Sequence, residues 1–75
     1  MTPDQTLDAV GLLCPLPVLK ARKRLSAMES GQILEMKADD PAAIIDVPHF
    51  CHESGCDLVS QNEKDGILTF LIRQK

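Results

Sequence analysis

The chain has 75 residues, a formal net charge of −3 and 44% apolar residues. This length makes one domain, residues 1–75, with a small core, and the acidic balance and near absence of aromatic side chains argue against direct nucleic-acid binding. No apolar run approaches the roughly 20 residues that a membrane-spanning helix needs, and the acidic N-terminal residues do not resemble a secretory signal.

Hydrophobic periodicity and turn residues predict six elements in the order β-α-β-α-β-β. A short strand is expected over residues 6–10, followed by a turn at Gly11. Helical spacing of apolar residues predicts a helix over 15–28, closed by Gly31. Strict alternation over 32–38 then predicts a half-buried strand.

The second half of the chain begins with another helix-start signal, Asp39-Asp40-Pro41. A helix is expected over 42–54 with Gly55 as its stop, and Pro48 either kinks it or separates a short first turn from it. Strands follow over 57–62 and 67–73, joined by a hairpin turn at Lys64-Asp65-Gly66.

These elements predict an α/β (α+β) two-layer sandwich. The β-α-β start implies a parallel strand pair with a right-handed crossover, and the closing hairpin adds an antiparallel neighbour. The result is a mixed four-stranded sheet with two helices on one face. The last strand is apolar on both sides and is therefore expected to be central. The first β-α turn, a usual place for chemistry in such folds, contains Cys14.

The tetrapeptide Cys14-Pro15-Leu16-Pro17 is the strongest functional signal. Proline is favoured in the first turn of a helix, which places Cys14 at or next to the N-cap. The helix dipole and the free N–H groups of Leu16 and Val18 favour negative charge there, so we expect a lowered pKa for the Cys14 thiol and a nucleophilic thiolate. The alternative is a buried, inert cysteine. Because Pro17 stands where a resolving cysteine would be, the motif favours a group carrier rather than a complete enzyme.

Half of the eight basic residues follow within five positions: Lys20, Arg22, Lys23 and Arg24. On a helix Lys20, Lys23 and Arg24 share one face, opposite the apolar face. This basic face is either solvated or a docking patch for an acidic partner or an RNA backbone. A non-catalytic interaction or regulatory module that uses this face is the alternative to a carrier.

A second group of potential ligands comprises His49, Cys51, His52 and Cys56. Their spacing matches no zinc motif, so no metal or other cofactor is expected, although a small metal protein using His49, His52 and Cys56 remains a competing hypothesis. Helical spacing places Cys51 in the core, and Cys56 is expected to be partly exposed. An odd number of cysteines without an export signal indicates a reducing, cytoplasmic setting, and leaves a Cys51–Cys56 or Cys14–Cys56 disulfide open.

The chain also resembles a known family over residues 6–73. The matching segments are Leu7-Asp8-Ala9, Gly11-Leu12-Leu13-Cys14-Pro15-Leu16-Pro17-Val18, Arg22-Lys23, Met28-x-x-Gly31, Ala38-Asp39-Asp40-Pro41-Ala42, Asp46-Val47-Pro48-x-Phe50-Cys51 and Phe70-Leu71-Ile72-Arg73. Together they resemble the TusA/SirA sulfur-carrier family, whose hallmark is Cys-Pro-x-Pro. The resemblance implies the strand order 1-2-4-3 and a persulfide carried on Cys14, with Pro15 and Pro17 supporting the motif.

The same resemblance implies partners. Sulfur would come from a cysteine desulfurase or another sulfurtransferase and pass to an acceptor protein in tRNA 2-thiolation, molybdenum-cofactor supply or sulfur oxidation. The chain departs from the tRNA-thiolation branch, which tends to have Arg and Glu where Leu13 and Leu16 stand, and Cys56 replaces a common histidine. An apolar rim around Cys14 would favour a different partner surface.

Overall fold

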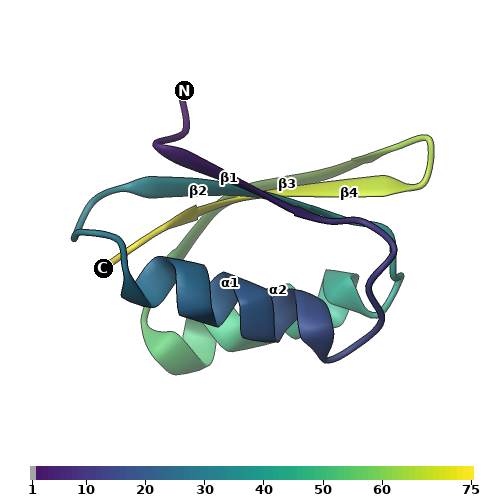
Figure 1. The fold of residues 1–75 in the computed structure, drawn as a ribbon, viewed down its shortest axis with the longest axis horizontal. Coiled ribbons are helices and arrows are strands. Elements are labelled where there is room, and N and C mark those ends of the chain that lie inside the picture. Colours follow the sequence, from purple (N-terminus) through teal and green to yellow (C-terminus); the bar gives the residue numbers. More distant parts are fainter. Residues whose placement is uncertain (1) are drawn as a thin grey trace.

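The computed structural model describes residues 2–75 and contains the six elements in the expected order. Their bounds are β1 Gln5–Ala9, α1 Leu16–Ser26, β2 Ile33–Ala38, α2 Ala43–Ser54, β3 Asp57–Lys64 and β4 Ile67–Arg73. The sheet forms one layer and both helices form the other, as Figure 1 shows. This confirms the two-layer sandwich with both helices on one face. No helix within residues 2–75 is long and apolar enough to cross a membrane.

The sheet has the strand order β1-β2-β4-β3, as the family resemblance implied. Strands β1 and β2 are parallel, and β4 is antiparallel to both β2 and β3, so β4 is central as its apolar sequence predicted. Because β1 and β2 run in the same direction, the loops that leave them for α1 and α2 lie at the same end of the molecule, on the right in Figure 1. The loop containing Cys14 therefore lies beside the loop containing Asp39 and Asp40.

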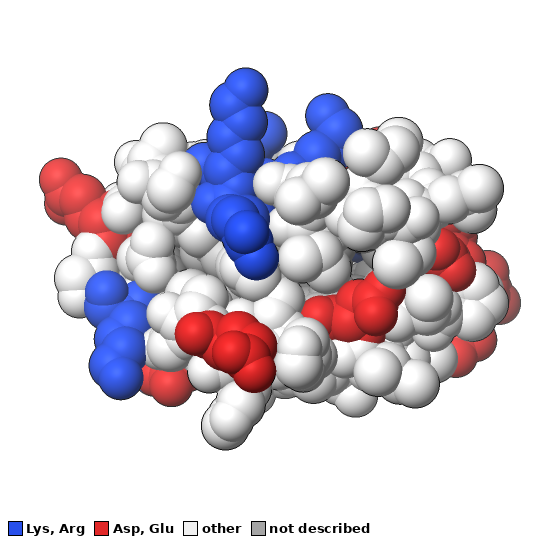
Figure 2. All heavy atoms as spheres, turned by 90° about the horizontal axis from the view of Figure 1, so that it is seen from below, with Lys and Arg blue, Asp and Glu red and all other residues white. Residues whose placement is uncertain are grey.

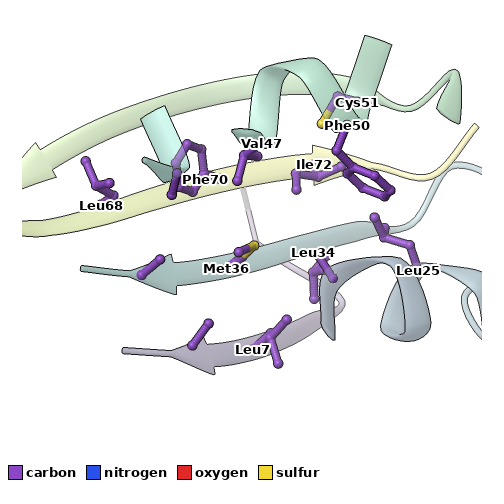
Figure 3. Close-up of a cluster of buried hydrophobic side chains, with 14 of the residues drawn as sticks. Leu7, Leu25, Leu34, Met36, Val47, Phe50, Cys51, Leu68, Phe70 and Ile72 are labelled. Carbon is purple, nitrogen blue, oxygen red and sulfur yellow. The ribbon is translucent and has the colours of Figure 1, made fainter. Parts of the chain in front are cut away.

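The core lies between the sheet and the helices, and the period-two pattern of the strands places it there. In β2 the alternate residues Leu34, Met36 and Ala38 are fully buried, and Lys37 between them is exposed. Figure 3 shows Leu34 and Met36 meeting residues from both helices and from β4. The labelled partners are Leu25 of α1, Val47, Phe50 and Cys51 of α2, and Leu68, Phe70 and Ile72 of β4.

Most element ends differ from the sequence prediction by one or two residues, and the differences at α1, α2 and β3 have identifiable causes. Helix α1 begins at Leu16 rather than at position 15, because Pro15 is its N-cap, and it ends at Ser26. Strand β3 extends to Lys64, since the hairpin needs only the two turn residues Asp65 and Gly66, both with positive φ. Pro48 lies inside one continuous helix, so the alternative of a separate first turn is wrong. Gly55, at φ 81°, ends that helix as predicted.

Candidate functional site

Cys14 is exposed and lies in the loop that joins β1 to α1, immediately before the N-cap residue Pro15. The peptide bond between the two residues is cis. The expectation that Cys14 lies next to the helix start is confirmed, and the alternative of a buried cysteine is wrong. The two prolines of the motif differ in environment, because Pro15 is exposed and Pro17 is buried in the first turn of α1.

Two consecutive aspartates hold the Cys14 loop in place. The Asp39 carboxylate accepts a hydrogen bond from the Gly11 N–H at 2.9 Å, and Asp40 accepts one from the Cys14 N–H at 2.7 Å. The other oxygen of Asp40 accepts the Ala42 N–H at 3.0 Å, at the start of the segment that leads into α2. One carboxylate therefore links the backbone of the candidate nucleophile to the N-cap residue of the second helix.

The pKa of the Cys14 thiol is raised above its ordinary value, so the prediction of a lowered pKa is wrong. The main cause is a hydrogen bond from the thiol to the Asp46 carboxylate, followed by desolvation and by the charges of Asp46 and Asp40. Two N–H donors close to the helix start, those of Leu16 and Cys14, are also engaged. The Leu16 N–H donates to the Leu13 carbonyl at 2.9 Å, and the Cys14 N–H donates to the Asp40 carboxylate. The carboxylates thus outweigh the helix N-terminus.

Asp46 is the site residue that sequence reasoning missed. It lies in the first turn of α2, more than 30 positions after Cys14, where an acidic residue is normally read as a partner of the helix dipole. The pKa of Asp40, by contrast, is lowered, because its carboxylate accepts the N–H groups of Cys14 and Ala42. Asp46 and Asp40 together thus favour the protonated form of the Cys14 thiol over its thiolate.

The four basic residues of α1 divide into two kinds. The Arg24 guanidinium donates to the Thr6 carbonyl at 2.9 Å, and Arg22 lies 5.6 Å from the centre of the Phe50 ring. These two arginines link α1 to β1 and to α2. Lys20 and Lys23 are exposed. The free positive charge along α1 is therefore that of the two lysines, Lys20 in the middle of the helix and Lys23 in its last turn.

The other two cysteines lie away from this site. Cys51 is buried as predicted, and desolvation is the main cause that raises its pKa to about 11. Cys56 is partly exposed, as expected, and donates to the Gln74 side-chain oxygen at 3.3 Å. All three cysteines are free thiols.

The residues of the metal hypothesis are not assembled as a ligand set. Within residues 2–75, no three side chains of His, Cys, Asp or Glu come together in a way that could hold a metal ion. His49 and His52 are exposed on α2, and the His49 imidazole lies 4.0 Å from the Glu53 carboxylate.

Comparison with known proteins places this chain in a family. The family described as Sulfurtransferase TusA matches residues 5–74. The chain belongs to the TusA family. It is 46% identical over 71 residues to the sulfur carrier protein TusA of Allochromatium vinosum, and this match covers 95% of this chain and 93% of the relative. The crystal structure of a SirA-like protein from Desulfitobacterium hafniense has the same fold, with a TM-score of 0.81 and 28% identity over 92% of this chain and 95% of that one.

Proposed function

We propose that this protein carries sulfane sulfur as a persulfide on Cys14 and relays it between two other proteins. The observation that supports this most directly is the exposed free thiol of Cys14 in a chain of the TusA family. The backbone N–H of Cys14 donates to Asp40, which holds the residue in place. Sulfur carriage is the general role of that family, and Cys14 is the one exposed cysteine of the three. The donor would be a cysteine desulfurase or another sulfurtransferase, and the acceptor a sulfur-relay protein.

Loading is a transfer of one neutral sulfur atom between two thiols. The Cys14 sulfur attacks the outer sulfur of the donor persulfide, R–S–S⁻, and the bond between the two donor sulfurs breaks. The products are Cys14–S–S⁻ and the donor thiol, which takes the proton that leaves Cys14. Unloading repeats the step with an acceptor thiolate as nucleophile and Cys14 as leaving group, so no external oxidant or reductant is consumed.

The carboxylates give the two forms of Cys14 different charges. Asp46 and Asp40 raise the pKa of the thiol and so disfavour the thiolate of the empty carrier. A persulfide is a stronger acid than the thiol it replaces, so the loaded form ionises more readily. The charge of that form then sits on the outer sulfur. Repulsion from the carboxylates would direct this sulfur away from the protein and towards an acceptor.

The basic residues of α1 are the proposed docking positions for partners. Lys20 and Lys23 are free to meet acidic side chains, and Arg22 and Arg24 add to the local potential while they hold α1 in place. This assignment predicts that charge reversal at Lys20 and Lys23 slows loading by a protein donor without affecting loading by inorganic polysulfide.

The test is the mass of the protein after incubation with a cysteine desulfurase and free cysteine. We expect a gain of one sulfur atom in the unaltered protein and in Cys51→Ser and Cys56→Ser, and no gain in Cys14→Ser. If neither a desulfurase nor polysulfide adds sulfur to Cys14, the proposal is wrong. A Cys14→Ser variant that keeps full biological activity would instead favour the interaction module.

A further inference from the structure

All large hydrophobic side chains that are exposed within residues 2–75 lie at one end of the molecule. They are Val10 at 41%, Leu13 at 71%, Leu16 at 46%, Leu19 at 47%, Ile44 at 44% and Ile45 at 74%. The first four belong to the loop after β1 and the beginning of α1, and the last two to the first turn of α2. Contiguous exposed apolar surface on a small protein marks an interaction site. We call these six residues the apolar rim.

The apolar rim lies at the end of the molecule that carries Cys14. Leu13 precedes Cys14 in the chain, and Leu16 donates its N–H to the Leu13 carbonyl, so both flank the thiol on the α1 side. On the α2 side, Ile44 and Ile45 lie in the first turn of the helix that follows Asp40, whose carboxylate accepts the Cys14 N–H at 2.7 Å. In Figure 2 the right-hand end of the helix layer, where both helices begin in Figure 1, is mostly white with acidic side chains among it.

We infer that the apolar rim binds the cysteine-bearing segment of a relay protein, and that this segment is itself apolar with acidic side chains beside it. The inference rests on the proposed function, because sulfur can pass only when a second sulfur atom contacts Cys14, which lies at the same end of the molecule as the rim. The acidic flank follows from charge. Helix α1 has four basic and no acidic residues among its 11, and the exposed Lys20 and Lys23 continue the α1 face beyond Leu16 and Leu19.

Asp40 does not contradict an apolar occupant. The Asp40 carboxylate already accepts two backbone N–H groups, from Cys14 at 2.7 Å and from Ala42 at 3.0 Å. The hydrogen-bonding capacity of Asp40 is thus used largely within the protein, and the leucine and isoleucine side chains are the groups that gain from burial against a partner.

The test measures how fast short cysteine peptides react with Cys14. In a Cys56→Ser background, Cys14 is converted to its mixed disulfide with 2-thiopyridine, and a peptide thiolate then displaces thiopyridone, which is followed by absorbance. The probes are Asp-Leu-Leu-Cys-Leu-Gly, Asp-Ser-Ser-Cys-Ser-Gly and Lys-Leu-Leu-Cys-Leu-Gly. Each rate is divided by that of 2-mercaptoethanol, which reports the intrinsic reactivity of the disulfide.

We expect the acidic leucine peptide to react roughly tenfold faster than the serine peptide, since partial burial of a few leucines is enough for such a ratio. Replacing Leu13, Leu16 and Ile45 by Ser should bring the ratio close to one. These three residues are exposed, so the variant keeps its core. The matched control is Leu71→Ser, on the helix-free face of the sheet, which should keep the full ratio. Charge reversal at Lys20 and Lys23 should remove the advantage of the acidic over the basic leucine peptide.

Three results would overturn the inference: equal rates for the leucine and serine peptides, a preference that persists without the apolar rim, or peptide rates that fall as protein concentration rises because a second copy of the chain covers the rim. None of these depends on persulfide chemistry. Loading of Cys14 by polysulfide without any protein partner tests the proposed function separately, so the failure of one is distinguishable from the failure of the other.

Discussion

The replacement of Pro17 by alanine should destabilise the fold by about 2 kcal/mol, because this proline is buried in the first turn of α1. Alanine lacks two ring carbons, and a buried methylene group is worth about 0.8 kcal/mol. Loss of the fixed φ also gives the unfolded chain more freedom, which costs about 0.4–1 kcal/mol. For a domain of this size, 1 kcal/mol corresponds to roughly 4–8 °C in Tm, so we expect a decrease of roughly 8–16 °C.

The assay is reversible denaturant unfolding of the purified protein, with thermal unfolding beside it. The matched control is Pro41→Ala, because Pro41 is exposed in the turn before α2 and should lose only the smaller chain-entropy contribution. A Pro17→Ala variant no less stable than Pro41→Ala would refute the reasoning. The second proline of the motif would then not be a core residue that fixes the helix start behind Cys14.

Three further predictions concern ionisable groups. Asp46→Asn should lower the pKa of Cys14 and speed its alkylation by iodoacetamide at neutral pH, because the main group that holds the proton is gone. The lowered pKa of Asp40 means that its contribution to stability is present above its unfolded pKa of about 3.9 and is lost as the pH falls through its folded value, so acid should destabilise Asp40→Asn less than the unaltered protein. Alkylation should reach Cys14 before Cys56, because Cys14 is exposed and Cys56 only partly so. Cys51 should react only on unfolding, because it is buried and burial raises its pKa to about 11.

Each of these three predictions can be contradicted by a specific result. Glu53→Gln removes an exposed carboxylate of the same helix and should leave the alkylation rate of Cys14 unchanged, so equal effects of the two substitutions would exclude a direct role for Asp46. Parallel curves of unfolding free energy against pH would show that Asp40 does not couple to folding. Modification of Cys51 in the native protein would mean that the packing of α2 against the sheet opens readily.

The fold could be predicted largely from local patterns. Alternation in 32–38 fixed which face of β2 is buried, and the apolar sequence of 67–73 on both sides indicated the central strand. The ends of the helices and strands were harder to predict from the sequence. A proline in the first turn is compatible with more than one starting residue, and the strand pairing of β3 continued up to the two-residue turn at Asp65 and Gly66 because those two residues suffice to reverse the chain.

The electrostatics of the site could not be predicted from local sequence. Helix position alone indicated a lowered thiol pKa, and that prediction failed because the deciding charges, Asp40 and Asp46, come from the other helix and its preceding loop. Parallel pairing of β1 and β2 brings the two loops together, and no local pattern near Cys14 contains that information. Similarly, the charge pattern of α1 did not separate Arg22 and Arg24, which contact α2 and β1, from the free lysines.

The central claim is that Cys14 both accepts and releases sulfur, and a load-and-chase mass measurement addresses it most directly. The protein is loaded with a cysteine desulfurase and cysteine, separated from the donor, and mixed with an excess of a peptide thiol while intact and fragment masses are followed. We predict one added sulfur atom in the fragment that contains Cys14, followed by its loss as the peptide persulfide appears. Sulfur found on Cys51 or Cys56, or sulfur that stays on Cys14 during the chase, would contradict the account.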